Sequence, residues 1–274
     1  MEIIKPSVEI WHQGEDWQAH VAKCARVCYA SKKITDNEQF CNGLIKASHY
    51  SMFRHVSHYF IGEPGSCLHE IALDFYGNPG VDVYFKMNKV YVVANGNWIL
   101  DNPDQYYMMK ESEVSIEDFK KDDIAKHMIR YTFKVITQIS TSRELNRVSP
   151  NNIAERSTRY VYENGTLCEP HWFNNTNMIG YEYLKQEYLY QCEESFRTYD
   201  RLIQNKLPKE DARGVLPLDT ATICIYTYSV DEWRHIIDLR YYGTTGKPHP
   251  NCVIIAGLIR EKLIEEGYAF REQD

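Results

Sequence analysis

The segment from Arg147 to Tyr160 contains the densest set of side chains in this sequence that could do chemistry. It reads Arg-Val-Ser-Pro-Asn-Asn-Ile-Ala-Glu-Arg-Ser-Thr-Arg-Tyr, with few apolar residues. Guanidinium groups are rarely buried without anionic partners, so the segment does not predict a dry core. Ser157, Thr158 and Arg159 place two hydroxyls and a fork of N–H donors side by side, which suits a phosphate. A solvated loop with surface ion pairs is the alternative that this segment alone leaves open.

Length and composition define the class of protein. The chain has 274 residues, of which 43% are apolar and 25% are charged, so it can build a hydrophobic core and does not resemble a disordered chain. Its net charge of −7 argues against a nucleic-acid partner and would make an arginine cluster a local positive site. No apolar run reaches membrane-spanning length, and the first residues lack a signal-peptide profile. We therefore expect a cytoplasmic protein with no membrane partner.

The eight cysteines do not follow a metal-binding pattern, because no Cys-x-x-Cys pair occurs. Cys24 and Cys28 share one face of a predicted helix, one turn after His20. A metal site there remains open, but buried thiols in a reducing compartment explain these residues better. We expect no metal.

Apolar periodicity predicts the elements that must position the arginine-rich segment. Tyr131, Phe133 and Val135 alternate with polar residues, as in a half-buried strand. Residues 61–129 contain several glycines and a β-rich run, and they look like an inserted module. The other elements predicted from the pattern are strands at 8–10 and 222–228 and helices at about 16–31, 179–205 and 251–266.

A capping box, Ser229-x-x-Glu232, predicts the start of a helix. At helical spacing, Trp233, Ile236 and Arg240 would fall on one face of it. An arginine on an apolar face can extend past the core, pair with an acid or point into a cleft, and the spacing does not choose among these.

Four ordered segments resemble the flavin-dependent thymidylate synthase family. Residues 147–160 resemble the family signature Arg-His-Arg-x-x-Ser-x-Asn-Glu-x-Ser-x-Arg-Tyr. Residues 48–55 resemble Gly-His-x-Ser-x-x-Glu-His, 213–217 match Arg-x-Val-Leu-Pro, and 233–240 match Trp-(Arg/Lys)-His-Phe-Phe-x-Leu-Arg. The resemblance implies an α+β fold, a mixed sheet flanked by helices. It also implies a single catalytic domain over 1–274, with the inserted module at about 61–129.

The resemblance implies conversion of dUMP to dTMP, with methylenetetrahydrofolate, FAD and NADPH. No protein nucleophile is needed, because reduced flavin supplies the reducing equivalents. By resemblance Arg240 is the catalytic residue, since an arginine near N3 and O2 of uracil favours the anionic ring and stays protonated at any working pH. The implied partners are dUMP and folate as small-molecule ligands. The implied assembly is a homotetramer in which protomers share active sites.

The family's binding residues can be carried over to matching positions of this chain. By resemblance, dUMP is bound by Glu144, Arg147, Glu155, Ser157, Arg159, Arg213 and Arg240. By resemblance, FAD is bound by His49, Ser51, Arg147, Val148, Ser149, Glu155, Ser229, Asp231 and His235. Plain helix capping remains an alternative for Ser51 and Ser229, and a structural role remains one for His49 and His235.

The chain departs from the family motifs at the expected flavin site. Val148 and Ser149 stand where the signature has His-Arg, Arg54 stands where the earlier segment has Glu, and Asn152 replaces the first Ser of the signature. These changes bear on flavin binding more than on nucleotide binding. Two other functions therefore remain open. One is a family-fold enzyme with altered chemistry on a pyrimidine nucleotide, such as hydroxymethylation, and the other is a non-catalytic nucleotide-binding paralogue.

Overall fold

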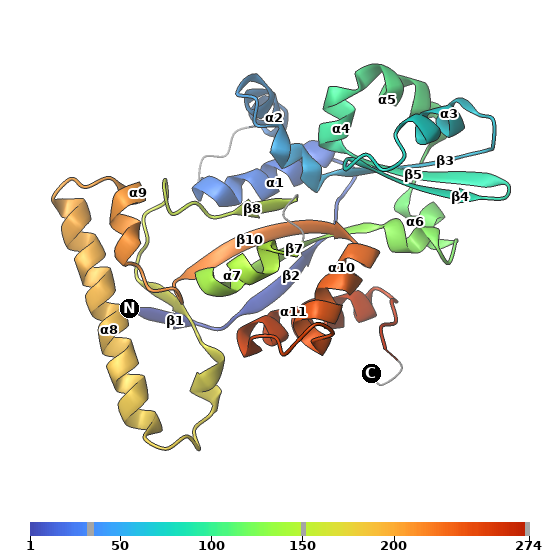
Figure 1. The fold of residues 1–274 in the computed structure, drawn as a ribbon. Coiled ribbons are helices and arrows are strands. Elements are labelled where there is room, and N and C mark those ends of the chain that lie inside the picture. Colours follow the sequence, from blue (N-terminus) through green and yellow to red (C-terminus); the bar gives the residue numbers. More distant parts are fainter. Residues whose placement is uncertain (32–35, 149–151, 272–274) are drawn as a thin grey trace.

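A four-stranded antiparallel sheet forms the centre of the protein (Figure 1). The structure, a computed structural model, describes residues 1–31, 36–148 and 152–271. The two middle strands pair along nine residues, from Arg130↔Ser229 to Gln138↔Ala221. The order of the strands is β2 (Ser7–Trp11), β7 (Arg130–Gln138), β10 (Ala221–Ser229) and β8 (Ile153–Glu155).

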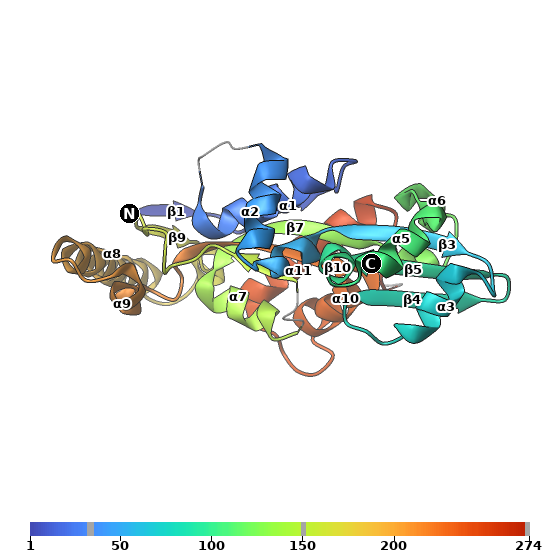
Figure 2. The same ribbon diagram turned by 90° about the horizontal axis from the view of Figure 1, so that it is seen from above.

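Helices cover both faces of this central sheet, as Figures 1 and 2 show. The alternation predicted for β7 is confirmed, because Tyr131, Phe133 and Val135 enter the main apolar core under one set of helices. One face carries α1 (Trp17–Tyr29) and α2 (Asn37–Lys46). The other face carries α7 (Ile139–Asn146), α10 (Val230–Ile237) and α11 (Pro250–Glu265).

A second antiparallel sheet lies beside the first. Three of its four strands lie within the run 61–129, but the fourth, β3, begins earlier, at Ser57. Its strands lie in the order β4 (Val81–Lys86), β5 (Lys89–Asn95), β3 (Ser57–Gly62) and β6 (Glu113–Val114). A 3₁₀ helix, Tyr50–His55, leads into it. The helices of this region are α3 (Cys67–Asp74), α4 (Gly96–Asp101), α5 (Pro103–Met109) and α6 (Ile116–Lys120).

The two sheets share one apolar core. Tyr59, Tyr91 and Phe119 from the second sheet region belong to the same buried cluster as Phe133 and Trp233 from the first. A contiguous core of this kind is typical of one folding unit. We therefore propose that residues 1–274 form a single domain, with the second sheet as an addition to the central one.

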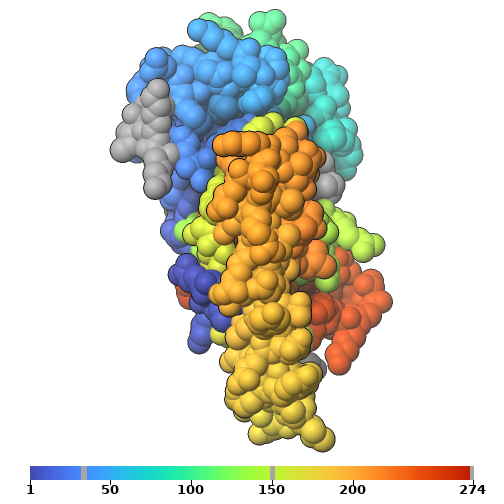
Figure 3. Space-filling view, turned by 90° about the vertical axis from the view of Figure 1, so that its left-hand side faces the viewer, coloured from blue at the N-terminus to red at the C-terminus, as the bar shows by residue number. Residues whose placement is uncertain are grey.

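A long helix, α8 (Tyr181–Gln204), lies along one side of the protein, and Figure 3 shows it from that side. It packs Cys192 and Phe196 against Leu167 in β9 (Thr166–Cys168), which pairs in parallel with β1 (Glu2–Ile4). The short α9 (Lys209–Ala212) follows. The predicted α+β fold, with helices flanking the sheets, is confirmed. The central sheet is antiparallel instead of mixed, because the parallel pair β1–β9 forms a separate two-stranded sheet.

The helix that follows Ser229 ends earlier than its spacing predicts. Both capping-box hydrogen bonds are present: Ser229 N–H donates to Glu232, and Glu232 N–H donates to the Ser229 hydroxyl. The α-helix stops at Ile237, however, and continues as a π-helical turn over Asp238–Tyr242. A π-helical turn holds more residues than an α-helical one, so the angle between Trp233 and Arg240 differs from that of the unbroken α-helix which the spacing predicts.

Within the described residues no helix combines the length and the apolar character needed to cross a bilayer. The same residues include no group of three potential metal ligands placed to share an ion. His20, the histidine nearest to Cys24 and Cys28 in sequence, instead bonds to the Thr132 hydroxyl.

His20 and His55 are linked by a buried chain of hydrogen bonds through the central sheet. His20 lies 3.0 Å from the Thr132 hydroxyl, Thr132 lies 2.7 Å from the Thr227 hydroxyl, and Thr227 lies 2.8 Å from His55 Nδ1. Burial lowers the pKa of His20 to about 4 and the pKa of His55 to about 3. Both imidazoles are therefore neutral in the folded protein at neutral pH.

We expect the protein to lose stability as the pH falls from 6.5 to 4. In this range the unfolded chain protonates both histidines near their usual pKa of 6.5, whereas the folded protein does not, so acid favours unfolding. At pH 4.5 each histidine lowers the free energy of unfolding by up to about 2–3 kcal/mol relative to neutral pH. Urea unfolding at pH 7.5 and 4.5 measures the loss. A His55→Asn variant should show a smaller loss between the two pH values, and an equal loss would contradict this explanation.

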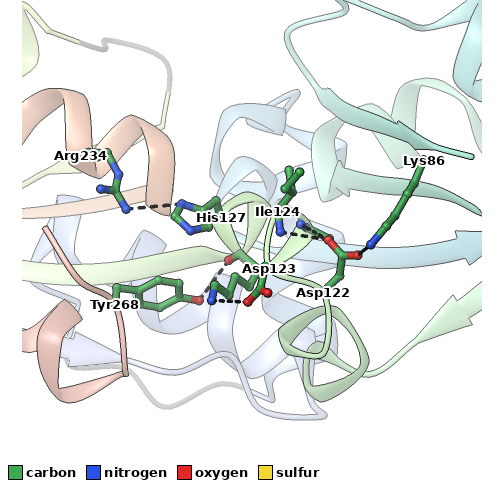
Figure 4. A network of polar contacts seen from close by, with 9 residues as sticks. Lys86, Asp122, Asp123, Ile124, His127, Arg234 and Tyr268 are labelled. Atoms are coloured by element: carbon green, nitrogen blue, oxygen red, sulfur yellow. Dashed lines mark hydrogen bonds and ion pairs between the residues drawn. The ribbon is translucent and has the colours of Figure 1, made fainter.

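Asp122 connects the second sheet to the segment before β7 (Figure 4). Its carboxylate accepts hydrogen bonds from Lys86 Nζ and from the backbone N–H groups of Ile124 and Ala125. Burial acts to raise the pKa of Asp122, but these donors outweigh it and lower the pKa to about 2. The ionised carboxylate therefore stabilises the fold at all pH values above about 4.

We expect Asp122→Asn to destabilise the protein by about 2 kcal/mol at pH 7, because an amide cannot accept from all these donors. Chemical denaturation measures the change. Asp123→Asn is the matched control, since the Asp123 side chain is 97% exposed and water screens its ion pair with Lys126. The difference in free energy of unfolding between wild type and Asp122→Asn should shrink as the pH falls from about 4 to about 2, where the Asp122 carboxyl becomes protonated. A gap that persists unchanged at low pH would rule out the charge as its cause.

Candidate functional site

A cavity of about 650 Å³ lies between the C-terminal end of β8, helix α7 and the turn that follows α9. We call it the arginine cavity. It brings together Glu155, Ser157, Arg159 and Arg213, four of the residues expected to bind dUMP. Residues 157 and 213 are far apart in sequence, so the fold assembles this site. The complete lining is Ile139, Ser142, Arg143, Glu155, Arg156, Ser157, Thr158, Arg159, Arg213, Gly214, Leu216, Pro217 and Leu218.

Hydrogen bonds hold the two sides of the arginine cavity together. Arg213 Nη1 donates to the Thr158 hydroxyl at 3.0 Å, and Arg213 Nε donates to the Glu210 carbonyl at 3.1 Å. Arg159 pairs with the Glu210 carboxylate through Nε at 3.0 Å and Nη2 at 2.9 Å. The loop 157–159 and the turn 210–213 are thus fixed to each other before any ligand is present.

Glu155 lies on the wall of the cavity in a polar setting. Its carboxylate accepts hydrogen bonds from the Ser142 hydroxyl at 2.9 Å and the Thr222 hydroxyl at 3.1 Å. Among the described residues no lysine or arginine forms an ion pair with it. The side chain is therefore oriented by neutral donors, and its charge is not balanced by a cation of the cavity.

Positive charge dominates the lining. It has four arginines, at positions 143, 156, 159 and 213, and one carboxylate, Glu155. Arg156 pairs with buried Glu163 at 3.3 Å, and Arg159 with Glu210. The exposed Arg143 forms no hydrogen bond or ion pair within the described ranges. In a protein of net charge −7, this concentration of guanidinium groups is suited to an anion.

Arg240 and Glu144 form a second group on a different face of α7. Arg240 Nη2 donates to the Glu144 carbonyl at 2.7 Å, and the Cys252 thiol lies 3.4 Å from the Glu144 carboxylate. The Arg240 Nε–H is buried and has no acceptor among the described residues. Neither residue lines the arginine cavity. The exposed Arg147 has no partner within the same ranges, so one protomer does not gather all the residues expected to bind dUMP.

The residues expected to bind FAD lie on separate surface elements. His49 and Ser51 are exposed around the start of the 3₁₀ helix 50–55, and Asp231 and His235 are exposed on α10. Ser229 is the cap of that helix, the role left open for it above. Val148 packs against the main apolar core, and Ser149 lies outside the described residues. Of the described residues expected to bind FAD, Glu155 alone lines the arginine cavity.

The sequence did not single out three residues that the structure adds to the site. Arg143 and Ser142 come from α7, and Glu210 comes from α9. Glu210 precedes Arg213 by one helical turn, and this spacing could have suggested that the two act together. Nothing in the sequence indicated that α7 would line the same cavity.

Cys28 lies beside the arginine cavity, since its carbonyl accepts from Ser157 N–H at 2.9 Å. Burial raises the pKa of the Cys28 thiol, and it raises the pKa of Cys24 to about 12. Thiols with raised pKa values are poor nucleophiles. These two cysteines are therefore structural rather than activated groups.

The fold is α+β, and its arginine-rich cavity has a size suited to a mononucleotide. The family described as thymidylate synthase complementing protein matches residues 120–264, which is more than half of the chain. The protein therefore belongs to this family. The matched region includes β7, α7, β8, α8, β10 and α10, and it contains every lining residue of the arginine cavity.

A curated relative and two solved structures are also similar to the chain. The probable flavin-dependent thymidylate synthase of Paramecium bursaria Chlorella virus 1 is 32% identical over 82 residues, which are 30% of this chain and 36% of the viral protein. The chain thus matches about a third of the length of that relative. The UMP/dUMP methylase PolB of Streptomyces cacaoi bound with 5-Br dUMP has a TM-score of 0.50 at 16% identity, covering 97% of this chain and 93% of the other. Its complex with 5-Br UMP also gives a TM-score of 0.50, at 15% identity, with 97% and 92% covered. At this identity the likeness concerns the fold alone.

Proposed function

We propose that this protein is a flavin-dependent enzyme that converts dUMP to dTMP. The observation that carries the proposal is the arginine cavity, which unites two segments of the family signature in one anion site. Membership of the thymidylate synthase complementing protein family supports the same reaction class. The substrates named for the structural neighbours, UMP and dUMP, are nucleotides of the size that the cavity accommodates.

In this proposal the arginine cavity holds the phosphate of dUMP. The Ser157 hydroxyl and the guanidinium groups of Arg159 and Arg213 act as donors, and charged donors of this kind bind phosphate oxygens strongly. Glu155 lies beside them, where it can accept hydrogen bonds from the rest of the nucleotide. The exposed Arg143 adds a charge that no residue of the described chain balances.

Arg240 acts on the uracil ring in this proposal. A guanidinium at N3 and O2 stabilises the negative charge that develops there when C5 acts as a nucleophile. The buried, unpaired Nε–H of Arg240 supports this role, because an orphan donor is the group expected to meet a substrate oxygen. Glu144 holds the arginine in place through its carbonyl.

We further propose that the active site is shared between protomers of a homotetramer. Arg240 and Glu144 lie outside the arginine cavity, and Arg147 is exposed and has no partner in the described part of the chain. A second protomer could therefore supply these groups to the cavity of the first. The exposed positions of His49, Ser51, Asp231 and His235 fit a cofactor held between protomers.

FAD would be held by those four residues, with NADPH as the reductant and methylenetetrahydrofolate as the carbon donor. Bound flavin would supply the reducing equivalents for the methyl group. The protein's own part is to bind dUMP, to orient its ring with Arg240, and to exclude water from the closed site.

Visible absorbance and product formation test the proposal. Purified protein incubated with FAD and dUMP should retain flavin absorbance after desalting. It should then form dTMP when methylenetetrahydrofolate and NADPH are added. UMP should be run in parallel, because the phosphate contacts do not distinguish the two sugars. A protein that retains no flavin and does not rescue a thymidine auxotroph would overturn the proposal.

Altered chemistry on the same nucleotide is the second candidate, and Val148 favours it. This residue packs against the apolar core at a position where the signature has a histidine, so it offers the flavin no polar group. Mass spectrometry of the product decides between the candidates, since a hydroxymethyl product is one oxygen heavier than a methyl product. A protein that binds dUMP but forms neither product would be a non-catalytic paralogue.

A further inference from the structure

A second cavity, of about 500 Å³, lies where the second sheet meets the start of β8. We call it the amide cavity, because asparagines dominate its lining. It shares no residue with the arginine cavity. Two of its lining residues, Arg54 and Asn152, are positions where the chain departs from the family motifs. The complete lining is Arg54, Phe75, Asn78, Pro79, Gly80, Asn95, Asn97, Trp98, Asp101, Asn102 and Asn152.

Three nearly buried side chains in this cavity have hydrogen-bonding groups without partners. Trp98 is 3% exposed, and its indole N–H is buried without an acceptor in the described part of the chain. Asn152 is 4% exposed, and its amide forms no hydrogen bond to the described residues. Asn95 is 3% exposed and uses only its carbonyl, which accepts from Trp98 N–H. Of these groups only the Trp98 N–H is itself fully buried, whereas the unused amide groups of Asn152 and Asn95 remain available to a ligand in the cavity.

Each remaining side-chain amide of the cavity forms one hydrogen bond within the protein, and this bond fixes its orientation. Asn97 donates to Asp101 at 2.8 Å and Asn102 donates to the Trp98 carbonyl at 2.9 Å, so each keeps its own carbonyl for another donor. Asn78 accepts from Gly80 N–H at 2.9 Å and keeps its NH₂ group. The cavity therefore offers donors and acceptors side by side, and the two charged residues of its lining, Arg54 and Asp101, have opposite signs.

The backbone around the cavity is rigid enough to hold this pattern. Asn95 is the N-cap of α4, so its side chain is fixed at the helix start. Gly80 faces Trp98 so closely that an added Cβ would lie 2.8 Å from Trp98 Cβ. Phe75 packs edge-on against the Trp98 ring, with 5.0 Å between ring centroids. A site held in this way binds without a large loss of side-chain freedom.

We propose that the amide cavity binds a nucleobase, separately from the phosphate site. A nucleobase is planar and close to neutral, and it carries donors and acceptors on adjacent atoms, as the lining requires. The free amide of Asn152 can donate and accept at once, the arrangement by which asparagine pairs with adenine N6 and N7. The cavity is large enough for a nucleoside. The base can come from a free nucleoside or from a dinucleotide cofactor.

Titration of the intact protein with adenosine, followed by calorimetry, tests the proposal. Adenosine should bind saturably, and Asn152→Ala should weaken binding about tenfold or more, as expected for one paired amide. FAD titrated in the same way distinguishes the sources. Asn152-dependent binding of FAD without binding of adenosine supports the site and assigns it to the base of the cofactor.

Control variants keep the result interpretable if one replacement disturbs folding. Trp98→Phe keeps a ring but removes the N–H, so it should also weaken adenosine binding, by less than Asn152→Ala. Asn164→Ala, which replaces an exposed asparagine outside the cavity, should leave binding and melting temperature unchanged. Two results would overturn the proposal: no saturable binding of adenosine or FAD, or affinities that Asn152→Ala and Trp98→Phe both leave unaltered. Binding of glucose in place of the nucleoside would overturn it as well.

Discussion

Arg213→Ala should weaken dUMP binding by roughly 30- to 150-fold, or about 2–3 kcal/mol. Arg213 lines the arginine cavity and also bonds to the Thr158 hydroxyl, so its removal takes away a charged donor and releases the loop beside it. Calorimetric titration with dUMP measures the change. Arg213→Lys should recover part of the loss, because lysine keeps the charge but not the planar fork.

Arg201→Ala is the matched control for this prediction. Arg201 is exposed on α8 and bonds to the Thr198 hydroxyl, a contact like the one Arg213 makes, but it lies outside the cavity. This variant should bind dUMP as the wild type does. If Arg213→Ala also retained wild-type affinity, the arginine cavity would not be the phosphate site.

Arg240→Ala should lower kcat by about 10²–10³-fold, the usual effect of removing one charge-stabilising donor from an active site. The change should be larger in kcat than in the Kd for dUMP, because the guanidinium acts on charge that develops during the reaction. Initial rates of dTMP formation at saturating dUMP give kcat, and titration gives Kd.

Arg240 also bonds to the Glu144 carbonyl, so a structural effect must be separated from a catalytic one. Arg240→Lys should keep the melting temperature near the wild-type value and still lose most of the activity, since an ammonium group cannot contact N3 and O2 together. Equal losses in kcat and in melting temperature across both variants would indicate a structural arginine.

The elements that are specified by residues close together in the sequence could be predicted from it. The alternating residues of β7 and the capping box at Ser229 and Glu232 appear where expected, and the β-rich run within 61–129 forms β4 and β5. The last helix ends before Gly267, which adopts a φ of +94°. These features depend on neighbouring residues alone, so short-range patterns are sufficient to find them.

Features that depend on packing between distant segments could not be predicted in this way. The π-helical turn at 238–242 interrupts a regular helical pattern. The contribution of α7 to the arginine cavity requires knowledge of how the helix lies on the sheet. The amide cavity combines Asn152 with residues of the second sheet region, and no spacing in the sequence links them.

The ion pair between Arg159 and Glu210 makes nucleotide binding an exchange of one anion for another. Glu210 holds the guanidinium edge in the absence of a ligand, at the position where a phosphate oxygen would compete for it. Both side chains are about half exposed, so water screens the pair and a phosphate can displace Glu210 at little cost. Added salt weakens the ion pair between Arg159 and Glu210 as well as the one between Arg159 and the dUMP phosphate. Arg159 should therefore contribute less to the ionic-strength dependence of dUMP affinity than an arginine without an internal competitor.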